Sequence, residues 1–368
     1  MESAKKLLAS TLKKIQKVNT SKHLLIGFDG FVDEIIHVVD KRRNEDDFDR
    51  IPDITAFSER VAQGAGLSAN IELVPTQVKL GGNGPIMANA IIAQGFDVSY
   101  IGALGKYYIH PVFSEFSTKC KKVISLTDPG FTEALEFFDG KVMLGKMNNL
   151  VDVNFENLIE KLPNQELVEL LESVDLLAFT NWTMLPKLNT IITEFNAIIS
   201  KLKKKPLVFL DLADPRKRTQ EDIRQVLTHI SEMGTSTILS MNLSESTIIS
   251  LVLGIKEDDL LLRASLIRKA LNNTAIVIHP VNGAAIAYEN EHIWVDGPYT
   301  PTPFLTTGAG DNFNAGFCNG WLNGMNPGES LLMGVCSSGF YVRHGYSPNM
   351  DELTGFIKNW DQADLGQI

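Results

Sequence analysis

The segment TTGAGDNF, residues 306–313, places two threonines and two glycines directly before a run with helical periodicity. Phe313, Phe317 and Trp321 stand at i, i+4 and i+8, which indicates one apolar helix face. The turn at 308–310 therefore lies at a helix N-terminus, where free backbone N–H groups and the helix dipole favour a bound anion. Because glycine lets the backbone approach a phosphate closely, the segment predicts a phosphate site.

Asp311 stands inside this predicted anion site, where a carboxylate is electrostatically unfavourable. Its presence there indicates a chemical role, such as accepting a proton from an attacking hydroxyl. The alternative is a glycine-rich loop that closes a helix, with Asp311 complementing the helix dipole. A short glycine motif does not decide between these interpretations by itself.

Short apolar runs alternate with helical segments along the rest of the chain, starting with the run at 23–28. Later runs of this kind lie at 98–101, 175–179, 207–211, 237–241 and 275–279. Strands separated by helices predict an α/β fold, with a mostly parallel central sheet flanked by helices on both faces. We interpret the stretches 31–40 and 134–147 as hairpins outside that alternation, the second turning at Asp139-Gly140, and they predict a small β lid.

The expected domain organisation follows from these patterns. Residues 1–21 are predicted to form an amphipathic helix, because Leu8, Leu12 and Ile15 follow helical spacing. Residues 41–60 are polar and are expected to be irregular. We expect a main α/β domain over 22–360 with a lid formed by about 31–80 and 131–150, and a C-terminal tail over 361–368.

Composition excludes several classes of protein. The net charge of −10 disfavours nucleic-acid binding, which depends on Lys and Arg. Three cysteines without a CxxC pair argue against a disulfide framework or a zinc site. No run approaches the ~18 apolar residues of a membrane span, and lysines interrupt any apolar core of a signal peptide. A cytoplasmic protein without membrane partners is therefore expected.

Two further segments complete a pattern. Residues 80–84, LGGNG, precede a helix, a strand and the pair Gly102 and Gly105, and residues 242–245, NLSE, follow the strand TILSM. With 306–313, these segments resemble the signatures of the PfkB/ribokinase family of carbohydrate kinases, over roughly residues 22–360. The resemblance implies a ribokinase-like fold with a small β lid and a phosphotransferase that moves the ATP γ-phosphate to a hydroxyl of a sugar or sugar-like substrate.

The resemblance also assigns roles within the 306–313 segment. Asp311 is expected to be the general base. The backbone amides of Gly308, Ala309 and Gly310 are expected to form an anion hole for the transferring phosphoryl group. Catalysis would then rest on positioning and electrostatic stabilisation of an in-line transfer.

Substrate contacts are implied at Gly81, Gly82 and Asn83, where the family binds sugar hydroxyls. A substrate-binding aspartate is expected just after the first strand, since a carboxylate can accept hydrogen bonds from two vicinal hydroxyls. We prefer Asp33, which directly precedes the lid strand, and keep Asp29 as the alternative because the spacing from Gly27 to Asp33 is one residue longer than expected. Asn181 follows the run at 175–179 and either contacts substrate or caps a loop.

The nucleotide contacts implied by the resemblance are Asn242, Thr306, Thr307, Gly308, Gly310 and Gly283. Glu245 is expected to hold Mg²⁺ through water, because Mg²⁺ retains several waters and takes few carboxylates. The alternative for Asn242 is a helix N-cap, which is compatible with the metal role. Asp211 and Asp214 resemble a DxNxR element, with Arg216 or Arg218 at the Arg position, although surface charge explains them equally well.

The chain departs from the family at two places. Leu305 stands six residues before Asp311, where family members usually have an Asp that helps to bind a monovalent cation, which leaves potassium activation doubtful. Ile278-His279-Pro280 replaces a TLG-like stretch that lines the nucleotide, while Gly283 is retained. His279 is either a ligand contact or a strand-end histidine with its own hydrogen bonds.

Several functions remain open at this stage. A nucleoside kinase of the same fold, an ADP-using kinase and a non-catalytic sugar-binding regulator on a kinase scaffold are the alternatives to a sugar kinase. The substrate itself is not specified by these motifs. An exposed edge of the β lid would suit pairing with a second subunit as a homodimer.

Overall fold

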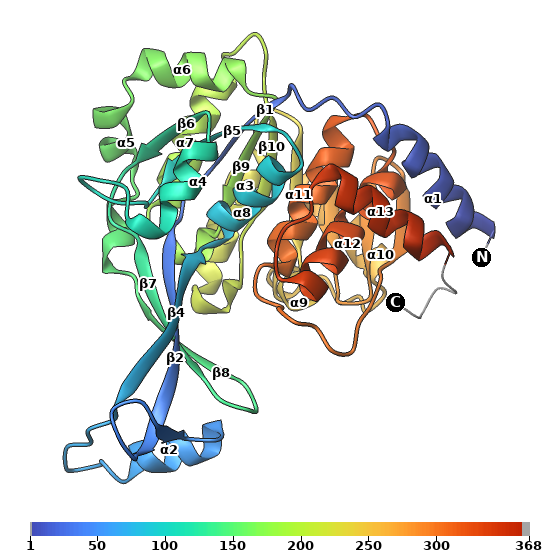
Figure 1. Cartoon of the computed structure of the whole chain (residues 1–368). Helices are drawn as coiled ribbons and strands as arrows, with labels where there is room; N and C mark the ends of the chain where they lie inside the picture. Colours follow the sequence, from blue (N-terminus) through green and yellow to red (C-terminus); the bar gives the residue numbers. More distant parts are fainter. Residues whose placement is uncertain (1, 363–368) are drawn as a thin grey trace.

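A nine-stranded sheet forms the centre of the protein in a computed structural model, which describes residues 2–362 (Figure 1). The strand order is β14-β13-β12-β11-β10-β9-β1-β5-β6, in which the pairs β12–β13 and β13–β14 are antiparallel and the other neighbouring pairs are parallel. The strands are β1 (His23–Gly27), β5 (Asp97–Gly102), β6 (Lys122–Ser125), β9 (Leu176–Thr180), β10 (Leu207–Asp211), β11 (Thr237–Met241), β12 (Ala275–Ile278), β13 (Gly283–Tyr288) and β14 (Glu291–Asp296). The predicted mostly parallel sheet is confirmed.

Helices cover both faces of this sheet because successive strand side chains point in opposite directions. On β1, Leu25 packs into the hydrophobic cluster on one face, whereas Leu24 and Ile26 pack into the cluster on the other. The helices on the face of Leu25 are α5 (Phe155–Lys161), α6 (Asn164–Ser173), α7 (Leu188–Ile199), α8 (Gln220–Ser231), α9 (Leu243–Val252) and α10 (Leu260–Leu271). Those on the opposite face are α1 (Glu2–Ile15), α3 (Asn83–Ala93), α4 (Ser114–Lys119), α11 (Ala309–Leu322), α12 (Pro327–His344) and α13 (Met350–Gln362).

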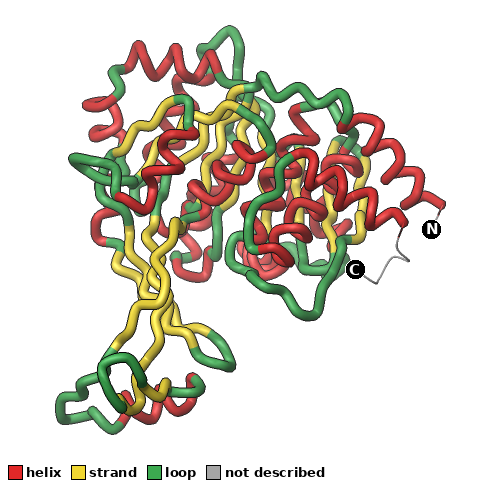
Figure 2. Tube along the Cα trace, in the orientation of Figure 1, coloured by secondary structure: helices red, strands yellow, loops and turns green. Residues whose placement is uncertain are grey.

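A second sheet projects from the body as a long arm, shown by the strands in Figure 2. Its central strand β2 pairs with β4 in antiparallel and with β7 in parallel orientation. The strands of the arm are β2 (Phe31–Arg42), β3 (Phe48–Arg50), β4 (Leu73–Gly81), β7 (Gly130–Glu136) and β8 (Lys141–Lys146). These strands come from the two segments assigned to the lid above, and their closure over a substrate stays a prediction.

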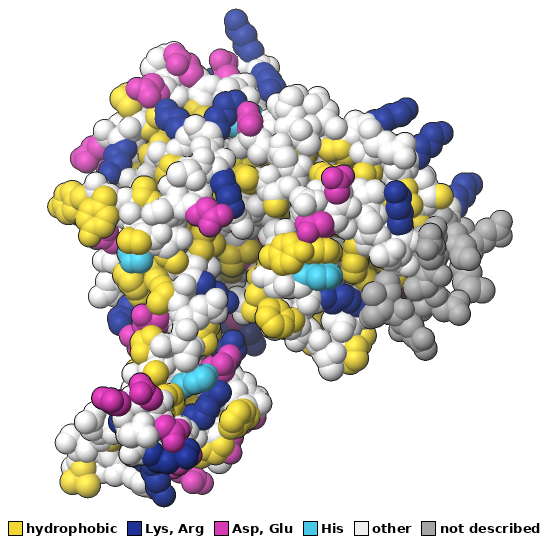
Figure 3. Space-filling view, in the orientation of Figure 1, with side chains coloured by type: hydrophobic (Ala, Val, Ile, Leu, Met, Phe, Trp, Pro, Cys, Tyr) yellow, Lys and Arg dark blue, Asp and Glu magenta, His cyan; other side chains and the backbone are white. Residues whose placement is uncertain are grey.

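The far end of the arm differs from the sequence prediction, because residues 41–60 are not irregular. They contain β3 and the helix α2 (Ile54–Ala62), which begins at the N-cap Asp53. A separate apolar cluster holds this end together, with Val38, Leu135 and Phe137 at its centre. On the surface, Lys/Arg and Asp/Glu side chains gather at the same end (Figure 3) and form ion pairs, among them Arg42 with Glu72 at 2.5 Å.

Three element boundaries also differ from expectation. The first helix ends at Ile15 instead of running through residue 21, and α13 continues to Gln362, two residues into the expected tail. Residues 363–368 of that tail lie outside the described residues. Residues 31–40 form no hairpin, because β2 is one long strand whose partner β4 begins at Leu73. Four short 3₁₀ helices complete the fold, at Pro111–Phe113, Asn148–Asp152, Trp182–Met184 and Pro215–Lys217.

Candidate active site

The predicted anion site lies at the start of α11, as expected from the glycine pattern. Gly308 adopts φ 94° and precedes the helix, a conformation that L side chains rarely adopt. A Cβ on Gly308 would lie 2.8 Å from the hydroxyl of Tyr341, which donates a hydrogen bond to Thr307 O at 2.9 Å. The Ala309 amide donates to Thr306 O at 3.1 Å. The amides of Gly310 and Asp311 have no acceptor within residues 2–362, as expected for a first helical turn.

Asp311 is buried in the first turn of α11. The Nδ2 of Asn83, at the start of α3, donates to its Oδ1 at 3.0 Å. Burial raises the pKa of Asp311 well above its usual value, and the charge of Asp211 raises it further, whereas the Asn83 bond opposes the shift. The two glycine segments predicted from sequence, 80–84 and 306–313, are therefore joined by a direct contact between a predicted substrate residue and the predicted base.

Asp211 is the last residue of β10 and belongs to a hydrogen-bond network that extends to α11 and β11. It accepts hydrogen bonds from Asn314 Nδ2 at 2.6 Å and from the Ala213 amide at 2.9 Å. Ser240 on β11 in turn donates to Asn314 Oδ1 at 2.8 Å. Burial raises the pKa of Asp211. This buried network holds a carboxylate at the carboxyl end of the sheet, the edge where α/β proteins place their ligands.

Asn242 and Glu245 form a capping box at the start of α9. The amide and the Nδ2 of Asn242 donate to the Glu245 carboxylate at 2.8 and 2.7 Å, and the Glu245 amide donates to Asn242 Oδ1 at 3.0 Å. The N-cap interpretation of Asn242 is thus confirmed. Burial, and then the charge of Asp211, raises the pKa of Glu245 to about 8.

These mutually repelling carboxylates fit a nearby divalent cation. Oxygen donors are the ligands that Mg²⁺ prefers, and a cation would relieve the repulsion that raises the pKa of Glu245. Residues 2–362 contain no group of three His, Cys, Asp or Glu side chains that would ligate a metal directly. The donor set therefore fits a metal held mainly through water and phosphate oxygens, with Glu245 as a water-mediated partner.

A cavity of about 540 Å³ opens beside the start of α11. Four of the six predicted nucleotide contacts line it: Asn242, Gly283, Thr306 and Gly310. Thr307 and Gly308 shape the loop but do not line the cavity. The opposite wall comes from the loop at 297–303, which joins β14 to the glycine segment and which the sequence patterns did not indicate.

His279 forms part of the floor of this cavity. Its ring stacks on Phe313 with centroids 4.5 Å apart, and burial lowers its pKa to about 4. Its buried Nε2 has no hydrogen-bond partner within residues 2–362. The strand-end interpretation with all hydrogen bonds made is therefore wrong for Nε2, and the ring is neutral at physiological pH.

Asp29, the alternative substrate carboxylate, is fully buried beneath the start of α3. It accepts hydrogen bonds from the amides of Asn83 at 2.9 Å and Gly84 at 2.8 Å, and from Asn181 Nδ2 at 2.6 Å. Burial raises its pKa to about 6 despite these bonds. A Cβ on Gly82 would lie 2.8 Å from Asp29 Oδ2, so the glycine allows this close approach. Asp29 thus anchors the glycine turn and Asn181.

Asp33, the preferred substrate carboxylate, lies on β2 where the arm leaves the body. It is directly opposite Lys79 on β4 and Thr132 on β7. Its carboxylate covers Gly81, since a Cβ there would collide with the carboxylate atoms. Burial raises the pKa of Asp33, while a hydrogen bond with Thr132 and the charge of Lys79 oppose the shift. Lys79 was not among the residues that sequence patterns indicated.

The DxNxR-like residues separate in the structure. Asp214 pairs with Arg216 at 2.7 Å in a partly exposed turn, as the surface-charge interpretation expects. Arg218 instead lies over the ring of Trp182 at 4.7 Å and donates to the carbonyl groups of Trp182 and Leu185. Of this group only Asp211 belongs to the acidic network around Asp311.

Comparison with solved structures identifies the fold. The ribokinase of Arabidopsis thaliana, solved with ribose and ATP, superposes with a TM-score of 0.67 at 16% identity, covering 92% of this chain and 99% of that one. The adenosine kinase of Sinorhizobium meliloti gives 0.66 at 14% identity, covering 93% and 99%. Phosphofructokinase-2 of Escherichia coli, in a mutant form, gives 0.66 at 13% identity, covering 93% and 99%. The fold is therefore ribokinase-like.

Sequence comparison defines the family more narrowly. A model of the prokaryotic ketohexokinase family matches residues 2–360. A ketohexokinase of Haloferax volcanii is 28% identical over 343 residues, which cover 92% of this chain and 91% of that protein. Fold and family together define a PfkB-type carbohydrate kinase. Within that class, the chain belongs to the prokaryotic ketohexokinase family.

Proposed function

We propose that this kinase transfers the γ-phosphate of ATP to a hydroxyl of a ketohexose, with Asp311 as the general base. The family match and the ketohexokinase relative support the ketohexose. One observation carries the assignment of the base: a buried carboxylate stands in the first turn of α11, beside unpaired backbone amides and a cavity of about 540 Å³. A carboxylate inside an anion site is useful when a hydroxyl must lose its proton there.

The chain's own groups would divide the reaction between them. Asp311 accepts the proton of the attacking hydroxyl, and Asn83 holds the Asp311 carboxylate in place through its Oδ1. The amides of Gly310 and Asp311 would bind the phosphoryl group, and those of Gly308 and Ala309 would join them if the Ala309 amide releases Thr306 O when the nucleotide binds. Fixed amide dipoles stabilise the charge that spreads over the transferring phosphoryl oxygens.

ATP would occupy the cavity between His279 and the loop at 297–303, with its phosphates directed to the start of α11. Mg²⁺ would supply charge neutralisation for the phosphates, held near Asn242 and Glu245 largely through water. The mutual repulsion among Glu245, Asp211 and Asp311 supports a cation at this place.

Asp33 is the better of the two candidates for binding the sugar. Both oxygens of Asp29 already accept hydrogen bonds from the protein, and the side chain is fully buried. The carboxylate of Asp33 has only Thr132 as a hydrogen-bonding influence on its pKa within residues 2–362, and it lies over the glycine turn that leads to Asn83. It therefore retains acceptor capacity for two sugar hydroxyls, while Asn181 acts on the site through Asp29.

A coupled ADP-release assay with Mg-ATP tests this function across ketohexoses, aldohexoses, pentoses, polyols and nucleosides. We expect a ketohexose to give the highest kcat/KM. Preference for a nucleoside by more than tenfold would reject the ketohexose in favour of the nucleoside kinase. Turnover that requires ADP in place of ATP would reject the ATP donor.

In the part of the chain that the structure describes, no helix is long and apolar enough to cross a membrane. The cytoplasmic location and the homodimer stay predictions.

A further inference from the structure

Lys79 presents an ammonium group beside the proposed sugar carboxylate. It is directly opposite Asp33 in the β2–β4 pairing, so both side chains project from the same face of the arm. Within residues 2–362 no carboxylate lies within 4 Å of its Nζ, although most of the arm's other lysines and arginines have such a partner. A half-buried ammonium group without a close ion pair keeps its hydrogen-bond donors for a ligand.

Asp33 has a polar neighbour on each of the two adjacent strands. Lys79, Asp33 and Thr132 form one polar row across β4, β2 and β7. Thr132 already hydrogen-bonds the carboxylate. Neighbouring strands lie about 4.8 Å apart, so the side chains of Lys79 and Asp33 are close neighbours on one face. A sugar hydroxyl both donates and accepts, and therefore fits between a carboxylate and an ammonium group.

The electrostatics agree with this geometry. Burial lowers the pKa of Lys79, and the charge of Asp33 is the largest influence that opposes the shift. The same row adjoins Gly81 and leads to Asn83, whose side chain contacts the base Asp311. Lys79 thus faces the end of the arm that is continuous with the catalytic residues.

We propose that Lys79 is a specificity-determining residue, which donates a hydrogen bond to a sugar oxygen while Asp33 accepts from the same or the adjacent hydroxyl. This inference rests on the proposed function and extends it to a residue that the sequence motifs do not include. The proposal gives a role to a positively charged side chain in a site whose other charged side chains are acidic.

Lys79→Met tests the proposal, with Lys79→Arg as the conservative variant. A hydrogen bond from a charged group changes affinity by about ten- to a hundredfold when it is lost, so KM for the ketohexose should rise by that factor in Lys79→Met. KM for ATP should stay within twofold of wild type. KM for the ketohexose in Lys79→Arg should lie between the values for wild type and Lys79→Met. Lys146→Met is the matched control, because Lys146 is an exposed arm lysine that pairs with Glu133 at 2.5 Å.

Calorimetric binding of the ketohexose to nucleotide-free enzyme separates the two claims. Weaker binding of the sugar to Lys79→Met than to Lys146→Met supports the role of Lys79. It does so even if the wild-type enzyme does not phosphorylate the sugar, because that result would reject only the proposed reaction. A sugar affinity unchanged within twofold in Lys79→Met, or an equal loss in Lys146→Met, would overturn the role of Lys79. Wild-type enzyme that neither binds nor phosphorylates any sugar would overturn both.

Discussion

Burial and the acidic side chains around it set the pKa of Asp311. Burial and then the charge of Asp211 raise its pKa well above that of an ordinary aspartate. The base form is the deprotonated one, so turnover should rise with pH through this pKa and then level off. The acid limb of the kcat profile is therefore expected to include the titration of Asp311.

Asp211→Asn should move that acid limb to lower pH. The substitution removes the neighbouring negative charge that raises the pKa of Asp311, so the carboxylate of Asp311 loses its proton more easily. The measurement is kcat against pH with saturating sugar and ATP. Asp214→Asn is the control, because Asp214 pairs with Arg216 and is not among the charges that shift Asp311. A limb that stays in place, or moves to higher pH, would contradict the electrostatic account.

The local sequence indicated the position of Asp311 at a helix start better than it indicated the neighbours of the site residues in space. Asp311 and the glycine turn were recognisable because a helix N-terminus follows from local spacing alone. Lys79 was not recognisable, because its neighbour Asp33 lies 46 positions earlier and only the register of β2 and β4 brings them together. The stacking of His279 on Phe313 likewise joins segments that are distant in the chain.

At the level of elements, the turn between β4 and α3 places the residues of the proposed sugar site. Gly81 ends β4 beneath the Asp33 carboxylate, and Gly82 turns the chain so that the first amides of α3 reach Asp29. One turn therefore fixes two carboxylates and directs Asn83 to the base. The strand-turn-helix pattern was predictable, whereas the long separation of β2 from β4 was not, because nothing local specifies which strands pair.

Gly81→Ala should weaken sugar binding selectively. The new Cβ would collide with the Asp33 carboxylate, which must then leave its place. We expect KM for the sugar to rise by about tenfold or more, since hydrogen bonds to a charged group are lost, with KM for ATP little changed. Gly355→Ala on α13 is the control, because its Cβ would meet no atom within 4 Å. Equal losses for sugar and ATP would point to damage of the whole site.

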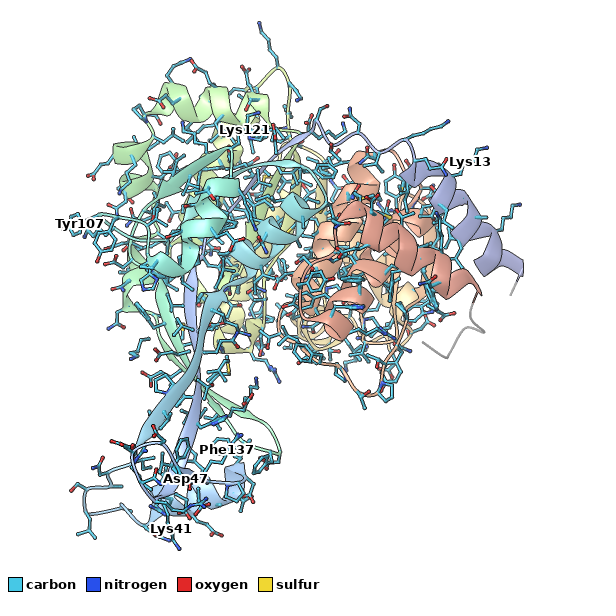
Figure 4. The ribbon with its side chains drawn as sticks, viewed as in Figure 1. Lys13, Lys41, Asp47, Tyr107, Lys121 and Phe137 are labelled. Carbon is cyan, nitrogen blue, oxygen red and sulfur yellow. The ribbon has the colours of Figure 1, made fainter. Side chains whose placement is uncertain are left out.

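At the level of the whole molecule, the body and the far end of the arm have separate hydrophobic cores. The clusters on the two sheet faces hold the body, while the small cluster around Phe137 holds β3 and α2. Figure 4 shows Phe137 with Asp47 and Lys41 at the far end of the arm, remote from Tyr107 and Lys121 on the body. The sequence predicted the body because its strands alternate regularly with helices, but the polar stretch 41–60 concealed this second core.

Phe137→Ala should therefore loosen the arm's end without unfolding the body. Loss of a buried phenylalanine costs about 3–5 kcal/mol where the site does not collapse, and the ring contact with Phe57 at 5.3 Å disappears. Hydrogen exchange should accelerate over residues 48–62 and stay unchanged in β1 and β9. Phe138→Ala is the matched control, since that neighbouring ring is 76% exposed. Faster exchange throughout the central sheet would show that the two cores unfold together.

The most direct test of the catalytic assignment is ADP release by Asp311→Asn with Mg-ATP and the preferred ketohexose, alongside calorimetric binding of ATP. Removal of a general base typically lowers turnover by about 10²–10⁴-fold, and we predict a loss of this size with ATP binding retained. The substituted amide would keep the size of the side chain and its place beside Asn83, so the fold should persist. Turnover within a few fold of wild type would contradict the role of Asp311 as the base and would require another group to take the proton.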